Sequence, residues 1–103
     1  MSEPDKLLKE LYELVKERKG SDASNSYTVS LFKKGKSRIA QKVGEEAVET
    51  VIAAMKGDKE ELVNETSDLL FHLLVLLAES DVELDEVIVE MQKRRMKREH
   101  DRD

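Results

Sequence analysis

Two stretches on either side of Gly57 carry acidic residues inside an otherwise apolar helical pattern. In residues 41–55, Glu46 and Glu49 are three positions apart, and in residues 65–77, Glu65 and Asp68 repeat that spacing. Side chains three or four residues apart share one face of a helix. Carboxylates that converge between two packed helices repel one another strongly unless a divalent cation lies among them. The pattern therefore favours a helical hairpin with a metal site between its arms.

The turn between the two stretches sets their register. Glu49 lies eight residues before Gly57 and Glu65 lies eight residues after it, so an antiparallel hairpin would place both acids at the same height. On a helical wheel the acids border apolar stripes that we expect to face the core. These stripes are Gly44, Val48, Val51, Ile52 and Met55 before the turn, and Leu62, Leu69, Leu73 and Leu76 after it.

The composition and length favour an all-α fold in one domain. The 103 residues include one Pro and four Gly, and aromatic residues make up 4%. We predict about five helices and a core like that of a four-helix bundle, completed by dimerisation because apolar residues exceed what one chain would cover. The single domain spans residues 1–103, with a charged tail over 92–103 that we expect to fray. The expected helices cover residues 3–19, 26–35, 37–56, 58–79 and 84–91.

Residues that favour helix ends lie at the expected boundaries. Ser26 or Asn25 would cap the second helix and Gly35 would end it, and Ser37 would cap the third. Gly57 suits the end of the third helix. Asp58 would cap the fourth, and Glu61 completes the spacing of a capping box.

Several function classes are disfavoured by composition. The chain has no Cys, which excludes disulfides and thiolate chemistry and suits a reducing cytoplasm. It shows neither a signal peptide nor an apolar run long enough to span a membrane, so we expect no membrane partner. The net charge of −5 argues against nucleic acid as a partner. Bases nevertheless gather just before the first acids, which suits a phosphorylated small molecule; they include Lys33, Lys34, Lys36, Arg38 and Lys42.

These segments resemble phosphoribosyl-ATP pyrophosphohydrolase of histidine biosynthesis, within the all-α NTP pyrophosphohydrolase superfamily that includes MazG-type proteins. The likeness covers about residues 7–95. It is carried by Ser26-Tyr-Thr-Val-Ser-Leu-Phe-Lys-Lys-Gly, by Ile39-Ala-Gln-Lys-Val-Gly-Glu-Glu-Ala-Val-Glu, by Glu65-Thr-Ser-Asp68-Leu-Leu-Phe-His and by Leu84-Asp-Glu-Val. The superfamily's paired acidic motif alone indicates only the superfamily, and the first two segments point to the particular family.

The resemblance implies a reaction and a set of site residues. Phosphoribosyl-ATP would be hydrolysed to phosphoribosyl-AMP and pyrophosphate, with Mg²⁺ as the cofactor and Mn²⁺ as a substitute. Such an enzyme would act in the cytoplasm as a homodimer, in the standalone form without a cyclohydrolase domain. The metal ligands would be Glu46, Glu49, Glu65 and Asp68; the catalytic acids Glu45, Glu46 and Glu49; and the phosphate contacts Lys33, Lys36, Arg38 and Lys42.

Other interpretations of the same residues stay open. The acidic stripes could be solvated flanks paired with lysines, as in many charged bundles. His72 could support a metal ligand or be a hydrogen-bonded histidine at the edge of the core, and Tyr27 could pack or reach the substrate. For the whole chain, the alternatives are a housekeeping pyrophosphohydrolase for other nucleoside triphosphates and a non-catalytic helical scaffold.

Overall fold

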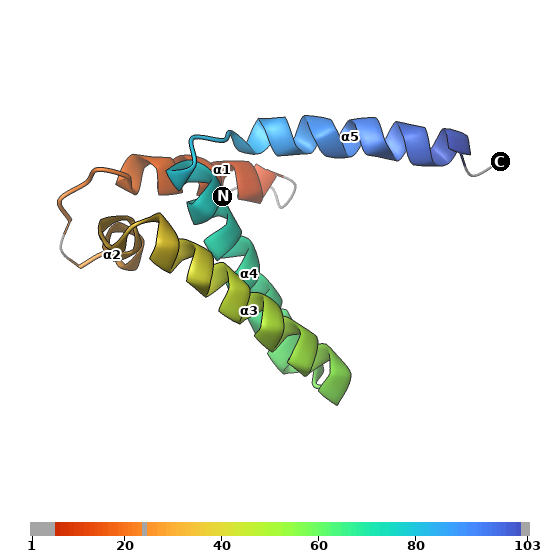
Figure 1. Ribbon diagram of the computed structural model, residues 1–103, viewed down its shortest axis with the longest axis horizontal. Coiled ribbons are helices and arrows are strands. Elements are labelled where there is room, and N and C mark those ends of the chain that lie inside the picture. Colours follow the sequence, from red (N-terminus) through yellow and green to blue (C-terminus); the bar gives the residue numbers. More distant parts are fainter. Residues whose placement is uncertain (1–5, 24, 102–103) are drawn as a thin grey trace.

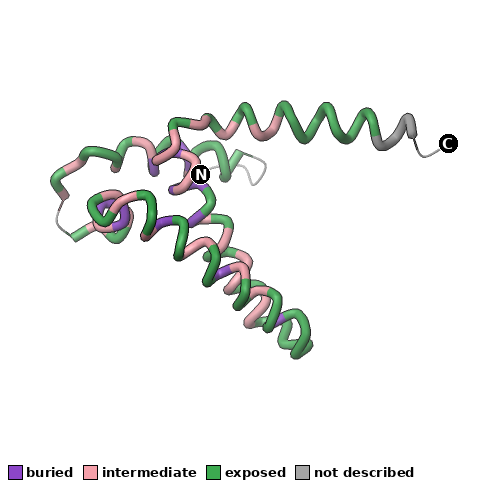
Figure 2. The backbone as a smooth tube through the Cα atoms, viewed as in Figure 1, coloured by how far each residue is buried: buried purple, intermediate pink, exposed green. Residues whose placement is uncertain are grey.

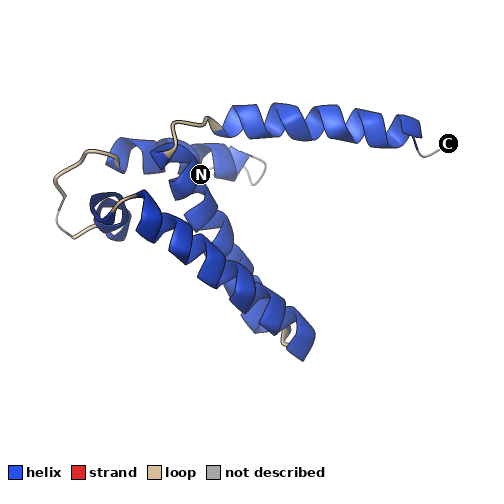
Figure 3. Ribbon diagram, viewed as in Figure 1, coloured by secondary structure: helices blue, strands red, loops and turns tan. Residues whose placement is uncertain are grey.

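The described part of the protein forms five α-helices joined by short connections. The structure, a computed structural model, describes residues 6–23 and 25–101, with backbone alone for 98–101, and it contains no strand within these ranges (Figure 3). None of the described helices is both long and apolar enough to cross a membrane. The all-α prediction is confirmed. The helices are α1 (Leu7–Arg18), α2 (Tyr27–Lys34), α3 (Lys36–Lys56), α4 (Lys59–Glu79) and α5 (Leu84–Asp101).

The helices α3 and α4 form a long antiparallel hairpin (Figure 1). Gly57 ends α3 in the left-handed region at φ 73°, which glycine adopts without a steric penalty. Asp58 then begins α4, and its Oδ1 accepts a 3.0 Å hydrogen bond from the Glu61 backbone N–H. The predicted stop and cap at this turn are therefore confirmed.

The corner between α2 and α3 is tighter than the sequence suggested. Ser26 caps α2, since its Oγ accepts a 3.2 Å hydrogen bond from the Val29 N–H. Gly35, at φ 93°, both ends α2 and serves as the N-cap of α3, so the chain turns within one residue. Ser37 consequently lies inside the first turn of α3 and makes no capping hydrogen bond. The predicted Ser37 cap is wrong.

The core lies where α1 and α2 meet the open end of the hairpin (Figure 2). Val15 of α1 and Val75 of α4 are buried at its centre, 2% and 0% exposed. The Tyr12 hydroxyl donates to the backbone carbonyl of Val82, which fixes the connection between α4 and α5 against α1. The buried members of this cluster are Tyr12, Val15, Leu31, Ile39, Leu74, Val75 and Ala78.

The buried face of α3 is not the one that the wheel assigned to the core. Its buried residues are Ile39, Glu46 and Ala53, which recur every seven positions along the seam with α4, as in coiled coils. The expected core stripe is mostly exposed instead. On α4 the buried residues are His72, Leu74, Val75 and Ala78, while Leu73 is 37% exposed. The exposed members of the predicted α3 stripe are Val48, Val51, Ile52 and Met55, at 59%, 60%, 48% and 82%.

The last helix extends away from the rest of the molecule (Figure 1). It meets α1 near its start, where Lys9 and Asp85 form a 3.3 Å ion pair, and it continues past Met91 through the charged segment to Asp101. The radius of gyration is 15.7 Å, whereas a compact chain of this length would have about 13 Å. One chain therefore leaves much of its helical surface uncovered.

Ser37, in the first turn of α3, and Asp58, the N-cap of α4, give a matched test of the helix ends. We expect Asp58→Ala to lower the free energy of unfolding by about 1 kcal/mol, because an N–H of α4 loses its acceptor. Ser37→Ala should leave it within about 0.5 kcal/mol, because Ser37 caps nothing. Urea unfolding monitored by circular dichroism measures both, and equal losses would contradict these helix boundaries.

Candidate functional site

Three carboxylates converge between α3 and α4. Glu46 and Glu49 lie one turn apart on α3, Glu65 faces them from α4, and one oxygen of each lies within 4.8 Å of the others. Glu46 is 6% exposed, Glu65 is half-buried and Glu49 is exposed. The register set by the Gly57 turn brings the two helices' acids to the same height. We call these three residues the acidic group.

The acidic group contains an unsatisfied oxygen. Glu65 Oε2 is buried and no donor in the described part of the chain reaches it. On the other side, Lys42 Nζ lies 3.5 Å from Glu46 Oε1 and offsets part of the negative charge. Burial works to lower the pKa of Lys42, but Tyr27, Glu46 and Glu45 outweigh it and the pKa is raised. Lys42 is thus held as a cation beside the acids.

The other two acids and burial oppose the ionisation of Glu65. Its pKa rises from 4.5 to about 7, first because Glu49 can accept a hydrogen bond from the protonated Glu65 carboxyl, and then because of burial and of Glu46. With a proton, Glu65 has a partner; without one, it needs a cation. The acidic group therefore takes up positive charge near neutral pH, either as a proton or as a metal ion.

The donor set fits a hard divalent cation. All three ligands are carboxylate oxygens, the type that Mg²⁺, Mn²⁺ and Ca²⁺ prefer. Oxygens on opposite sides of one such ion are about 4–5 Å apart, twice the metal–oxygen distance, and the acidic group spans at most 4.8 Å. Glu46, Glu49 and Glu65 could hold such an ion.

Asp68, the fourth expected ligand, lies outside the acidic group. It is at the height of Glu46 but is exposed, and it lines a groove between α4 and the apolar face of α1. Asp68 is therefore near Glu65 along α4, but its side chain lies toward α1 instead of toward Glu46 and Glu49. The structure brings together three of the four predicted ligands.

The remaining predicted residues lie toward the start of α3. Glu45 is exposed and accepts a 3.0 Å hydrogen bond from Gln41 Nε2. Lys33 and Lys36 flank the α2–α3 corner and are exposed, whereas Arg38 is half-buried. Arg38 precedes Glu46 by eight residues, or about 12 Å along the helix. Of the predicted phosphate-binding bases, the structure brings Lys42 into contact with the acidic group.

A histidine and a tyrosine form a hydrogen-bonded pair that the sequence did not specify. His72 is 5% exposed; its Nδ1 lies 2.7 Å from the Asp68 carbonyl oxygen and its Nε2 lies 2.8 Å from the Tyr27 hydroxyl. His72 is thus the hydrogen-bonded histidine at the core edge. Tyr27 packs against His72 and Phe71, with ring centroids 5.8 and 6.3 Å apart, but the residue stays 52% exposed. The spacing of His72 four residues after Asp68 indicated the backbone contact, but no local signal indicated Tyr27.

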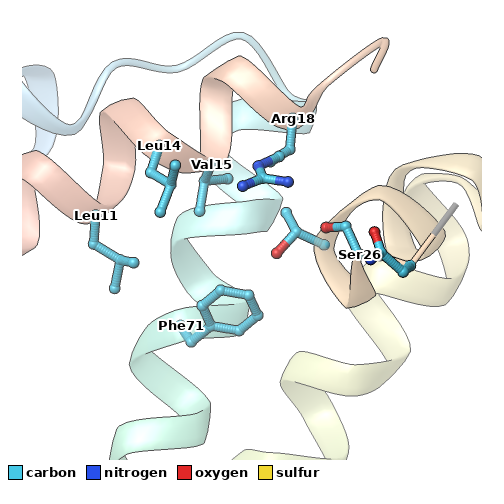
Figure 4. A pocket seen from close by; sticks show the side chains of 8 residues that line it. Leu11, Leu14, Val15, Arg18, Ser26 and Phe71 are labelled. Carbon is cyan, nitrogen blue, oxygen red and sulfur yellow. The ribbon is translucent and has the colours of Figure 1, made fainter. Parts of the chain in front are cut away.

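A separate pocket lies between α1, α4 and the start of α2 (Figure 4). Leu11, Leu14, Val15 and Arg18 line it from α1, Phe71 from α4, and Ser26 from the N-cap of α2. It contains none of the acidic group. The Phe71 ring is nevertheless edge-on to His72, with centroids 5.2 Å apart, so the pocket and the Tyr27–His72 pair share one wall.

A helical hairpin with opposed carboxylates at one height is typical of the all-α NTP pyrophosphohydrolase class. Comparison with known families is more specific, since the sequence model described as phosphoribosyl-ATP pyrophosphohydrolase matches residues 8–95. This chain belongs to the phosphoribosyl-ATP pyrophosphohydrolase family. The matched range agrees with the resemblance expected from the motifs.

Curated relatives are of two lengths. A phosphoribosyl-ATP pyrophosphatase of Paramagnetospirillum magneticum is 51% identical over 94 residues, which cover 91% of this chain and 86% of the relative. The corresponding protein of Geobacter metallireducens is 49% identical with the same coverage. The histidine biosynthesis bifunctional protein HisIE of Buchnera aphidicola is 56% identical over 87 residues, 84% of this chain. The match spans only 40% of that longer protein.

The raised pKa of Glu65 predicts a dependence of stability on pH in a metal-chelating buffer. The folded state keeps the Glu65 proton up to about pH 7, whereas the unfolded chain releases it near 4.5. Folded protein therefore binds more protons in this window, and the contribution of Glu65 to stability is lost as pH rises from about 4.5 to about 7. Thermal unfolding across this range should show a smaller decline in Glu65→Gln than in the wild type. Identical slopes in both proteins would contradict the assignment.

Proposed function

We propose that this protein hydrolyses phosphoribosyl-ATP to phosphoribosyl-AMP and pyrophosphate, as the names of its curated relatives indicate for them. The observation that carries the proposal is the acidic group within the matched range, with its unsatisfied Glu65 oxygen. A solvated acidic flank would not bury Glu46 or leave an oxygen without a donor. This argues against both a structural role for the acids and a non-catalytic scaffold.

The cation that we propose for the acidic group is Mg²⁺, with Mn²⁺ as a substitute. Glu46, Glu49 and Glu65 would hold it, and Asp68 would join them by a change of its exposed side chain. When bound, Mg²⁺ would neutralise phosphate charge and make water a better nucleophile. The protein's own contribution is to hold carboxylates of both helices at one height before the substrate arrives.

The bases around the α2–α3 corner would bind the substrate's phosphates. Lys42 is already held as a cation beside Glu46. Arg38 and Lys36 lie about one and two turns nearer the corner on α3, and Lys33 is at the end of α2 just before it. Charge-assisted donors of this type suit phosphate oxygens.

Glu45 is our candidate for orienting the attacking water. Its carboxylate is exposed beside the acidic group, and Gln41 and Lys42 hold it at 3.0 and 3.8 Å. A carboxylate in this position can accept a proton as water attacks phosphorus at the α,β bridge. Glu46 and Glu49 would be catalytic because they would hold the cation that neutralises the charge of the reacting phosphate.

We propose that the protein is a homodimer. The apolar face of α3 formed by Val48, Val51, Ile52 and Met55 is exposed along two turns of the helix. Val63, Leu70 and Leu73 are also exposed on α4. Apolar area of this extent on a chain this small is typical of an interface. We further assign the protein to the cytoplasm, where a chain without cysteine loses no disulfide stabilisation.

The reaction is tested by pyrophosphate release from phosphoribosyl-ATP, with dATP and dUTP as competing candidates. We expect turnover of phosphoribosyl-ATP that requires Mg²⁺. Glu46→Gln and Glu49→Gln should each lower kcat/KM by about 100-fold or more, because several kcal/mol of charge stabilisation depends on these ligands.

Glu60→Gln is the matched control for loss of an acid. Glu60 is exposed in the first turn of α4, away from the acidic group, and its substitution should leave turnover unchanged. Preference for dATP or dUTP would transfer the assignment to a housekeeping pyrophosphohydrolase. Metal-independent turnover, or none with any nucleotide, would contradict the proposed chemistry.

The dimer is tested by light scattering coupled to size-exclusion chromatography. The wild type should have twice the chain mass of 11.8 kDa. Val51→Lys or Ile52→Lys should shift it to the monomer, because a charge within an apolar interface is costly. Glu60→Lys adds the same group at an exposed polar position and should leave the mass unchanged. A monomeric wild type would refute the homodimer.

A further inference from the structure

The two hydrogen bonds of His72 determine which groups donate. Nδ1 contacts the Asp68 carbonyl oxygen at 2.7 Å, and a carbonyl can only accept, so Nδ1 carries a hydrogen. In the neutral ring, Nε2 is then an acceptor. The Tyr27 hydroxyl, 2.8 Å from Nε2, therefore donates its only proton to His72.

The Tyr27 oxygen is thereby left as an acceptor. Because its one proton is donated to His72, this oxygen can only accept a hydrogen bond from a further partner. The His72 ring is buried and packs edge-on against Phe71 and Tyr27, with centroids 5.2 and 5.8 Å apart, which fixes its orientation. Tyr27 itself is 52% exposed. Its hydroxyl is thus held by a rigid partner on a side chain that ligands can reach.

The position of Tyr27 connects it to the acidic group. Through His72, the Tyr27 hydroxyl is linked to the backbone carbonyl of Asp68, one of the proposed metal ligands. Asp68 lies one turn beyond Glu65 on α4. The Tyr27 hydroxyl therefore borders the site where α2 approaches both arms of the hairpin.

We propose that Tyr27, oriented by His72, accepts a hydrogen bond from an O–H group at the active site. This inference deepens the proposed function and rests on it. Ionised phosphate oxygens are themselves acceptors and cannot supply the proton. Among O–H groups at such a site, two can supply it: a ribose hydroxyl of the substrate, or the attacking water. His72 is a positioning residue, and Tyr27 is the residue that contacts the donor.

The first test compares two tyrosines that each lose one hydroxyl. Tyr27→Phe should lower kcat/KM for phosphoribosyl-ATP by about tenfold, the effect of one hydrogen bond worth roughly 1.4 kcal/mol. Tyr12→Phe is the matched control, since the Tyr12 hydroxyl donates to the Val82 carbonyl and lies in the α1–α5 region. It should leave kcat/KM unchanged even where it lowers thermal stability.

Two substitutions at His72 separate its two contacts. His72→Gln can place an amide oxygen near the Nε2 position and so keep an acceptor for Tyr27, while His72→Asn can keep the donor to the Asp68 carbonyl but loses that acceptor. We expect His72→Gln to retain most activity and His72→Asn to lose as much as Tyr27→Phe. Adding Tyr27→Phe to His72→Asn should cause no further loss. An equal loss of activity in both His72 variants would contradict the positioning role of His72 and leave it a structural one.

Binding of a non-hydrolysable analogue distinguishes the two donors. With a methylene group in place of the α,β-bridging oxygen, a ribose donor predicts about tenfold weaker binding to Tyr27→Phe. Deleting the responsible 2′- or 3′-hydroxyl should abolish that difference. A water donor predicts unchanged analogue binding and a loss confined to kcat.

The outcome for Tyr27 is separable from that for the reaction. If the wild type hydrolyses phosphoribosyl-ATP and Tyr27→Phe has the same kcat, KM and analogue affinity, the inference is overturned and the proposed function stands. If the wild type prefers another triphosphate, that nucleotide is used for the same comparison. If it hydrolyses none, the inference fails together with the proposed function on which it rests.

Discussion

The antiparallel pairing of α3 with α4 is the constraint on which the rest of the structure depends. One turn at Gly57 and Asp58 fixes both the direction and the register of two helices of 21 residues each. Because each residue adds about 1.5 Å along a helix, acids at equal distances from the turn meet at one height. A single inserted residue in either arm would rotate the acids by about 100° and separate them. The chemistry of the site is therefore set by the geometry of the hairpin.

The hairpin accommodates this acidic group at a cost in stability. A buried carboxylate loses hydration, and the 3.5 Å contact of Glu46 with Lys42 offsets only part of that loss. Glu65 responds by holding a proton to a higher pH than usual. A cation that binds only the folded state would replace the proton and stabilise the hairpin by mass action, by about 2.7 kcal/mol at a hundred times its dissociation constant. Ligand binding and folding are coupled at the same three carboxylates.

The features that could be predicted from the sequence are those set by local chemistry. The Asp58 cap, the Gly57 stop and the equal spacing of Glu49 and Glu65 from the turn each depend on a few neighbouring residues. The Ser37 cap failed because Gly35, with a positive φ, turns the chain and caps α3 two residues earlier. Asp68 matched the motif in height but not in direction, since its side chain lines the groove toward α1 and the spacing of the motif does not specify this rotation of α4.

The orientation of the helices about their own axes could not be predicted in this way. A helical wheel gives only relative angles, and α3 carries apolar residues on two faces. The buried face of α3 is that of Ile39, Glu46 and Ala53, and the Val48 face is left exposed. Choosing between the faces requires the packing of α1, α2 and α4 around them, which no local pattern contains.

The exposed face of α3 also bears on the chemistry of the site. Ile52, a member of the Val48 face, is three residues after Glu49 and so adjoins it on the helix surface, and a second copy that covered this face would lie beside the most exposed member of the acidic group. Excluding water there would lower the local dielectric and strengthen each interaction between a carboxylate and a cation. Assembly would then bury Glu49, as packing against α4 already buries Glu46. On this basis the oligomeric state and the strength of the metal site are expected to change together, because one helix carries both surfaces.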